Sequence, residues 1–183
     1  MKKRFIACSV GAVIAIAGAT WPEKVRTSQA AQQKMAKYED CRRTPYYCPA
    51  GVLTVGIGST AGVQNRTYQL DEIAERWVND LVRAEKCINQ NFNGAAAPQF
   101  VFDALTDISF NVGCTGISWF TNRQGNKQRT TLWKHAQAKN WIGVCNRLTD
   151  FVNSGGRRMQ GLVNRREEFQ AWCLSDPTLQ GKK

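Results

Sequence analysis

Apolar residues recur at steps of three and four along most of the chain. The longest such run is Leu70, Ile73, Trp77, Leu81, Ala84 and Ile88. This spacing predicts one long amphipathic helix. Pro98 suits the first turn of a second helix, whose apolar face continues until Gly113. Further helices are expected over 29–40, ending near Glu39, and over 130–138, 140–148 and 162–174 with Arg and Glu on its outer face.

Residues 42–60 break the helical pattern. They hold two prolines and three glycines among the β-forming residues Tyr46, Tyr47, Val52, Thr54, Val55 and Ile57. Such a mixture predicts a small hairpin. One small sheet among many helices indicates an α+β fold that is mainly helical.

The N-terminus has the layout of an export signal. Lys2, Lys3 and Arg4 precede an uncharged run of 17 residues, 5–21. Glycines and alanines dilute this run, which lies at the lower limit for spanning a bilayer, so we expect a weak anchor over 1–22 and a second domain over 23–183. Cleavage near 17–19 is the alternative.

The charge balance indicates an anionic partner. The 183 residues include 25 Lys and Arg against 14 Asp and Glu, a net charge of +11. Nucleic acid, an acidic membrane face and the bacterial cell wall are candidates. The basic residues lie in scattered pairs, so nucleic acid is not the expected partner. A single histidine, His135, excludes a zinc site of several imidazoles, and neither a metal nor a cofactor is expected.

Seven cysteines favour an oxidising compartment. The odd number leaves one thiol over after full pairing. Cleavage of the signal would remove Cys8 and leave six.

Glu39, Cys48 and Thr54 are the candidate catalytic residues, with spacing Glu-x8-Cys-x5-Thr. Glycoside cleavage needs a carboxylic acid that is protonated near neutral pH, and a second group on the opposite face of the sugar. Glu39 suits the first role, because the neighbouring aromatic residues Tyr38 and Tyr46 are expected to desolvate it.

These residues resemble the active-site hairpin of the phage-type lysozymes, glycoside hydrolase family 24. The resemblance extends over residues 35–175 and includes Asn-Val-Gly at 111–113, Ser-Gly-Gly at 154–156 and Arg-Arg-Glu at 165–167. It implies a two-lobed fold with a long connecting helix. It also implies muramidase activity on the β-1,4 bond between N-acetylmuramic acid and N-acetylglucosamine of peptidoglycan.

Cys48 stands where most of these enzymes have aspartate, as in a subgroup of signal-arrest-release endolysins. That resemblance implies an enzyme exported by the host secretion machinery, tethered inactive on the periplasmic face of the inner membrane and later released into the periplasm. A bridge between Cys41 and Cys48 would cage the catalytic thiol, and Cys8 would exchange into it after release. Cys87, Cys114, Cys145 and Cys173 would pair among themselves, in an order that the sequence leaves open.

The resemblance gives two further residues a role. Asn111 is expected to line the sugar cleft, with capping of its helix as the alternative. Arg165 is expected to orient Glu39 through an ion pair, with an exposed surface position as the alternative. The enzyme is expected to act as a monomer.

Two other functions remain open. A cysteine peptidase would use Cys48 and His135, but this leaves Glu39 without a role. A secreted cationic wall-binding protein with a cleaved signal would need no catalysis.

Overall fold

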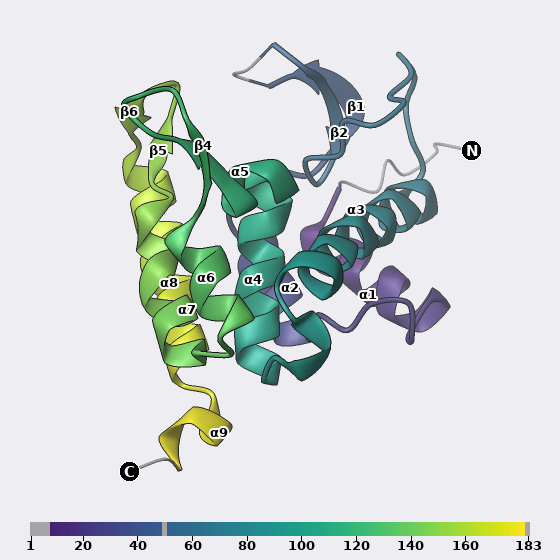
Figure 1. Ribbon diagram of the computed structural model, residues 1–183. Helices are drawn as coiled ribbons and strands as arrows, with labels where there is room; N and C mark the ends of the chain where they lie inside the picture. The colour runs from purple at the N-terminus through teal and green to yellow at the C-terminus, as the bar shows by residue number, and fades with distance from the viewer. Residues whose placement is uncertain (1–7, 49–50, 182–183) are drawn as a thin grey trace, which may run out of the picture. The chain divides into compact units, whose positions relative to one another are not determined.

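The computed structural model describes residues 8–48 and 51–181. The chain forms two compact units, with the boundary between Val82 and Arg83. This boundary falls inside α3 (Leu70–Asn91), the long helix expected from the apolar repeat. Figure 1 shows the helices and strands of both units.

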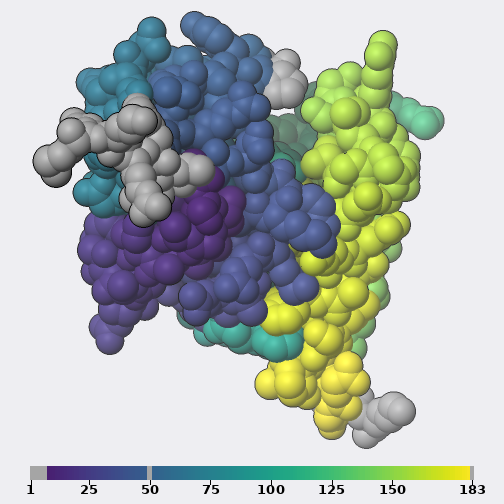
Figure 2. All heavy atoms as spheres, turned by 180° about the vertical axis from the view of Figure 1, so that it is seen from behind, coloured from purple at the N-terminus to yellow at the C-terminus, as the bar shows by residue number. Residues whose placement is uncertain are grey.

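The first unit contains α1 (Val10–Thr20), α2 (Gln29–Ala36), β1 (Arg42–Tyr47), β2 (Leu53–Gly56) and the first part of α3. Its core includes Val13 and Ile14 of α1, and α1 packs with α2. Figure 2 shows the outer side of this N-terminal segment in purple. Trp77 of α3 is fully buried, and its indole N–H donates to Oε1 of Gln32 at 3.1 Å. The apolar face of the N-terminal segment is thus part of this core.

The helix that was expected over 29–40 is shorter than predicted, since α2 ends at Ala36. The N–H groups of Tyr38 and Glu39 bond to the carbonyls of Met35 and Ala36, each three residues back. This tightening of the last turn ends the helix before the chain becomes extended in β1. Glu39 therefore lies in a turn, not at a helix end.

β1 and β2 form the expected hairpin. Tyr46 pairs with Thr54 and Arg42 with Gly56, so β1 holds two more residues than β2 between these pairs. This is a bulge in β1. Gly56 has φ +64°, and a Cβ there would lie 2.8 Å from Cγ2 of Ile73 in α3. Glycine at this position lets the hairpin approach α3 closely.

The second unit follows the rest of α3. Its helices are η1 (Gly94–Ala96), α4 (Gln99–Val112), α5 (Cys114–Ser118), α6 (Thr131–Gln137), α7 (Trp141–Arg147), η2 (Leu148–Asp150), α8 (Gln160–Leu174) and α9 (Pro177–Gln180). The core is built on α4, nine of whose fourteen residues are buried, and α4 packs with α7 and α8. The helices expected over 130–138, 140–148 and 162–174 are confirmed.

Two short hairpins in this unit were not predicted. They are β3 (Trp119–Thr121) with β4 (Lys127–Arg129), and β5 (Asn153–Ser154) with β6 (Arg157–Arg158). Their strands are only two or three residues long, too short to show the alternating pattern that marks a strand.

The expectation that the Arg and Glu residues of α8 lie on its outer face is also wrong in part. Arg165 and Arg166 point inward and are 2% and 0% exposed. A buried carboxylate, Asp107 of α4, accepts from both guanidinium groups. The ion pairs compensate the cost of burying these charges.

Two disulfides join elements of the second unit. Cys87 of α3 bonds to Cys114 of α5, and Cys145 of α7 bonds to Cys173 of α8. Among residues 8–48 and 51–181, no helix combines the length and the hydropathy needed to cross a bilayer.

Candidate active site

Glu39 lies within electrostatic reach of Tyr46. Its side chain is half-buried in the turn that follows α2. Burial raises the pKa of Tyr46, and the charge of Glu39 raises it further. Asp40 and Cys48 act on the pKa of Tyr46 in the same direction, so all three groups lie within electrostatic reach of this ring.

Cys48 follows the last residue of β1. Its N–H donates to the carbonyl of Val52 at 3.0 Å, and its carbonyl accepts from the N–H of Gly51 at 2.8 Å. These two bonds fix the backbone of Cys48 at the hairpin turn, whose residues 49–50 lie outside the described chain. The side chain is half-buried, and Cys48 is the one cysteine of the described residues outside a disulfide.

Thr54 lies opposite Tyr46 in the β1–β2 register and is 2% exposed. Its hydroxyl donates to the carbonyl of Val52 at 2.9 Å. This bond fixes the direction of the hydroxyl proton, and the oxygen keeps the capacity to accept a hydrogen bond. Tyr46 thus pairs with Thr54 in the strand register and lies within electrostatic reach of Glu39 and Cys48.

Cys8 and Cys41 form the third disulfide. Cys41 immediately precedes β1, and Cys8 precedes α1, so the bond ties the N-terminal segment to the start of the β1–β2 hairpin. Asp40, between Glu39 and Cys41, is exposed and pairs with Arg42 at 3.0 Å. That Asp40 has no part in the catalytic site stays a prediction.

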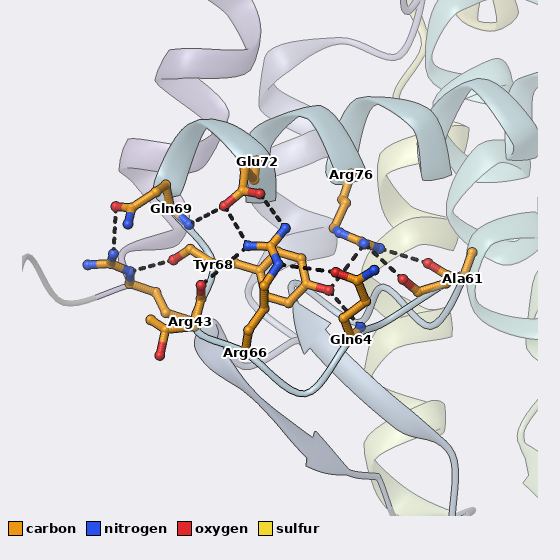
Figure 3. A network of polar contacts seen from close by, with 10 residues as sticks. Arg43, Ala61, Gln64, Arg66, Tyr68, Gln69, Glu72 and Arg76 are labelled. Carbon is orange, nitrogen blue, oxygen red and sulfur yellow. Dashed lines mark hydrogen bonds and ion pairs between the residues drawn. The ribbon is translucent and has the colours of Figure 1, made fainter.

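Arg43 ties the bulge of β1 to the start of α3 (Figure 3). Its carbonyl accepts from the N–H of Tyr68 at 2.9 Å, and its Nε donates to the carbonyl of Tyr68 at 2.8 Å. Its Nη2 donates to Oε1 of Gln69 at 2.8 Å. The bulge is thus held at three points, one residue beyond Arg42.

The loop that receives Arg43 is itself held by a charged network (Figure 3). The guanidinium groups of Arg66 and Arg76 lie 4.1 and 4.8 Å from the centre of the buried Tyr68 ring. Glu72 of α3 accepts from Arg66 at 2.6 Å and from the N–H of Gln69 at 2.8 Å. The bond from Arg66, followed by the bond from Gln69, lowers the pKa of Glu72 to about 2.

Asn111 and Arg165 lie in the second unit. The side-chain oxygen of Asn111 accepts from Nη2 of Arg166, which also binds Asp107. Arg165 donates to Asp107 at 2.8 Å and is buried, so the alternative of an exposed surface arginine is wrong. The pairing of Arg165 with Glu39 stays a prediction.

Sequence reasoning missed Arg166 and Asp107. A signal was present, because Asp103 and Asp107 lie one turn apart on the otherwise apolar helix α4. Carboxylates on such a helix need buried partners. No group of three His, Cys, Asp or Glu side chains within the described ranges is arranged to hold a metal ion.

Comparison with known proteins decides the family. The family model described as Phage lysozyme matches residues 36–168, which include the turn of Glu39, the hairpin and most of α8. The chain belongs to the phage lysozyme family. Its members are muramidases, and this lysozyme is accordingly a glycoside hydrolase with the α+β fold expected from its sequence.

Curated relatives cover nearly all of this lysozyme. It is 42% identical over 153 residues to the SAR-endolysin of Escherichia phage P1, covering 82% of this chain and 83% of the relative. It is 39% identical over 186 residues to the SAR-endolysin of Haemophilus phage HP1, covering 96% of this chain and all of the relative.

Two solved structures of the P1 phage endolysin Lyz are similar to this lysozyme. The active form matches with a TM-score of 0.89 at 38% identity, covering 97% of this chain and 98% of that one. The secreted inactive form matches with a TM-score of 0.64 at 37% identity, covering 86% and 99%. The structure of this lysozyme is thus more similar to the active form of the P1 endolysin than to its secreted inactive form.

Proposed function

We propose that this lysozyme is an endolysin that hydrolyses the β-1,4 bond between N-acetylmuramic acid and N-acetylglucosamine during host cell lysis. Membership of the lysozyme family supports the reaction, and the names of the curated relatives, SAR-endolysins, support the role in lysis. The substrate is the glycan strand of peptidoglycan, bound by a monomer, and the net charge of +11 favours association with the anionic cell wall.

Glu39 is the general acid in this proposal. It protonates the glycosidic oxygen as the bond breaks. Its half-buried position in the turn before β1, within electrostatic reach of Tyr46, supports this role.

Cys48 and Thr54 act on the face of the sugar opposite to Glu39. Cys48 works as a thiolate, either attacking the sugar carbon or taking a proton from water. The oxygen of Thr54 accepts a hydrogen bond from the same water and orients it, because the hydroxyl proton is already donated to Val52. Asn111 contacts the glycan from the second unit.

The same thiol regulates the enzyme. In the inactive state Cys41 is bonded to Cys48. The thiolate of Cys8 then attacks the sulfur of Cys41, the Cys41–Cys48 bond breaks, and Cys48 leaves as a thiolate. One disulfide is exchanged for another, so no oxidant or reductant is consumed.

The N-terminal residues 1–22 remain attached throughout this process. They carry the chain through the host secretion machinery and tether it to the periplasmic face of the inner membrane; after release the segment packs into the enzyme as it becomes periplasmic. Val13, Ile14 and Ala17 of α1 are buried in the core of the first unit, which supports a second use for this apolar segment.

One observation carries the proposed activation: Cys8 is bonded to Cys41, and Cys48 is outside the three disulfides. This is the pattern expected after exchange. The higher TM-score against the active form of the P1 endolysin supports the same state.

Digestion of purified peptidoglycan tests the activity. The oxidised protein should release new reducing sugar ends, and Glu39→Gln should release none while unfolding at the parent temperature. Asp40→Asn, one residue away and exposed, is the matched control and should stay active. New amino groups would indicate a peptidase using Cys48 and His135, and release of neither product would indicate a wall-binding protein without catalysis.

A further inference from the structure

The basic charge of the chain is concentrated in one segment of the second unit. Residues 108–149 contain no Asp or Glu, and they carry six cations: Arg123, Lys127, Arg129, Lys134, Lys139 and Arg147. This segment supplies more than half of the net charge of +11. The segment stands out because acidic residues are absent from it, and the structure gives its cations a defined surface.

The β3–β4 hairpin is the projecting part of that segment. Antiparallel pairing places Trp119 opposite Arg129 and Thr121 opposite Lys127. The guanidinium of Arg129 lies 3.6 Å from the centre of the Trp119 ring and 4.4 Å from that of Trp133 in α6. The ammonium of Lys127 lies 5.1 Å from the Trp119 ring. One face of the hairpin is thus a compact cluster of indoles and cations.

The opposite face of the hairpin exposes an apolar ring. Phe120 follows Trp119 and projects to the other side, because side chains alternate along a strand. Its side chain is 46% exposed, one of the larger exposures of an apolar residue in the described chain. Burying this ring elsewhere would remove apolar surface from water, which is favourable.

The hairpin is rigid before any partner binds. At its tip, the side-chain oxygen of Asn122 accepts from the N–H groups of Gln124 at 3.0 Å and Asn126 at 2.9 Å. At its base, the hydroxyl of Thr130 donates to the carbonyl of Ile117 at 2.6 Å. A preformed surface loses little conformational entropy on binding.

We propose that the β3–β4 hairpin docks on the surface of a bilayer rich in anionic phospholipid. The negative charge of lipid phosphates is complementary to the positive charge of Arg123 and Lys127. Indoles and phenyl rings are favoured at the boundary between headgroups and acyl chains, where an apolar body and a polar edge are both accommodated. A hairpin that enters the headgroup layer edge-on places Phe120 and the Trp119 face in it together.

The glycan strand is a poorer occupant of the same surface. Sugar rings bind to proteins by stacking on open aromatic faces, but the guanidinium of Arg129 already lies over Trp119 and close to Trp133. Arginine in such a stack keeps its N–H edge for hydrogen bonds to phosphate oxygens. The surface therefore fits a layer of phosphates better than it fits an uncharged sugar chain.

Co-sedimentation with lipid vesicles tests the proposal on the full-length oxidised protein. Vesicles of phosphatidylglycerol mixed with phosphatidylcholine are compared with vesicles of phosphatidylcholine alone. Lys2, Lys3 and Arg4 beside the apolar N-terminal segment also favour anionic lipid, so the contribution of the hairpin is isolated by comparing hairpin variants with matched controls that keep the same N-terminus. We expect preference for the anionic vesicles, and a decline of that preference as salt is added.

Two pairs of variants assign the preference to the hairpin. Lys127→Glu should weaken binding to the anionic vesicles about tenfold, whereas Lys86→Glu makes the same charge change on the exposed side of α3 and should have a smaller effect. Phe120→Ser should also weaken binding, whereas Ile142→Ser, at another exposed apolar position, should not. Thermal unfolding of each variant shows that the fold is kept.

Three results would overturn the proposal. The first is equal binding of the parent protein to both vesicle types. The second is an equal loss in the hairpin variants and in their controls. The third is unchanged vesicle binding together with weaker binding of Lys127→Glu to isolated cell-wall sacculi, which would make the hairpin a wall-binding element.

Discussion

Arg43 and Tyr68 are joined by two hydrogen bonds that run in opposite directions. Tyr68 donates its N–H to the carbonyl of Arg43 at 2.9 Å, and Arg43 donates Nε to the carbonyl of Tyr68 at 2.8 Å. The pair connects the bulge of the catalytic hairpin to the loop before α3. It therefore fixes the strand that carries Tyr46 and leads to Cys48.

Arg43→Ala is expected to lower the rate of peptidoglycan hydrolysis about tenfold, because small displacements of catalytic groups are costly. Its melting temperature should change little, since the hairpin keeps its own backbone bonds. Arg147→Ala is the matched control, because Arg147 is an exposed arginine of the second unit that pairs with Asp150. Equal activity of the two variants would remove Arg43 from the positioning of the site.

Thr54→Val tests the role of the hydroxyl. Valine is nearly isosteric, so the loss of one buried hydrogen bond costs about 1 kcal/mol of stability. Activity should fall further, by roughly a hundredfold, if the oxygen orients water. Thr54→Ser keeps the hydroxyl and should retain most of the activity. If hydrolysis and melting temperature decline in parallel in Thr54→Val, the residue has only a packing role.

Asp107 is expected to be a stability determinant. It is fully buried and accepts from Arg165 and Arg166 at 2.8 and 2.5 Å. Asp107→Asn removes the buried charge to which both guanidinium groups bond, which costs about 3–5 kcal/mol in the free energy of unfolding. The control is Asp150→Asn, which removes an exposed ion pair between Asp150 and Arg147, whose charged atoms are 3.6 Å apart. This change should cost under about 1 kcal/mol. Urea denaturation measures both, and equal values would contradict the buried network.

The lowered pKa of Glu72 predicts that the stability of the fold decreases slightly at acid pH. Its folded-state pKa of about 2 lies below the ordinary value of 4.5. Its stabilising contribution is therefore present above about pH 4.5 and is lost as the pH falls toward 2. Thermal unfolding between pH 6 and 3 should show a decline that is shallower in Glu72→Gln, by roughly 1–3 °C because the pair is exposed. Glu75→Gln, on the same helix, should follow the parent profile.

The sequence predicted what depends on local pattern. The repeat from Leu70 to Ile88 predicted α3, and the cluster of glycines, prolines and β-formers predicted the β1–β2 hairpin. Both are confirmed, because helix periodicity and turn chemistry act over a few residues. The end of α2 was wrong by three residues, because the tightened turn at Tyr38 and Glu39 leaves no compositional mark.

Features that depend on residues far apart in the chain could not be predicted from the sequence. Arg165 and Arg166 looked like exposed residues of a charged helix until Asp107, 58 and 59 positions away, supplied their countercharge. The disulfide order among the last four cysteines likewise depends on the packing of α3 on α5 and of α7 on α8. In the site, the spacing predicted that the hairpin folds Glu39, Cys48 and Thr54 toward one another, but the pairing of Tyr46 with Thr54 emerged only from the strand register.

The cysteines give the most direct test of regulation. Cys8→Ser should be exported but should stay inactive, since no thiol remains to open the bond between Cys41 and Cys48. Cys41→Ser should be active while still tethered to the membrane, because Cys48 then has no partner in the hairpin. Cys48→Ser should be inactive in either state. Host lysis time and mass-spectrometric mapping of disulfides measure these outcomes together.

Opposite effects of substituting Cys8 and Cys41 distinguish disulfide exchange from the simple loss of a stabilising bond. Cys8→Ser and Cys41→Ser both remove the disulfide seen in the first unit, so a purely structural role would make the two variants alike. Cys87→Ser with Cys114→Ser removes a disulfide of the second unit and is expected to lower the melting temperature without changing the timing of lysis. If Cys8→Ser lyses cells as fast as the parent, exchange is excluded and the Cys8–Cys41 bond is static. If the released parent protein begins near Thr20, the N-terminal segment is cleaved and Cys8 has no part in activation.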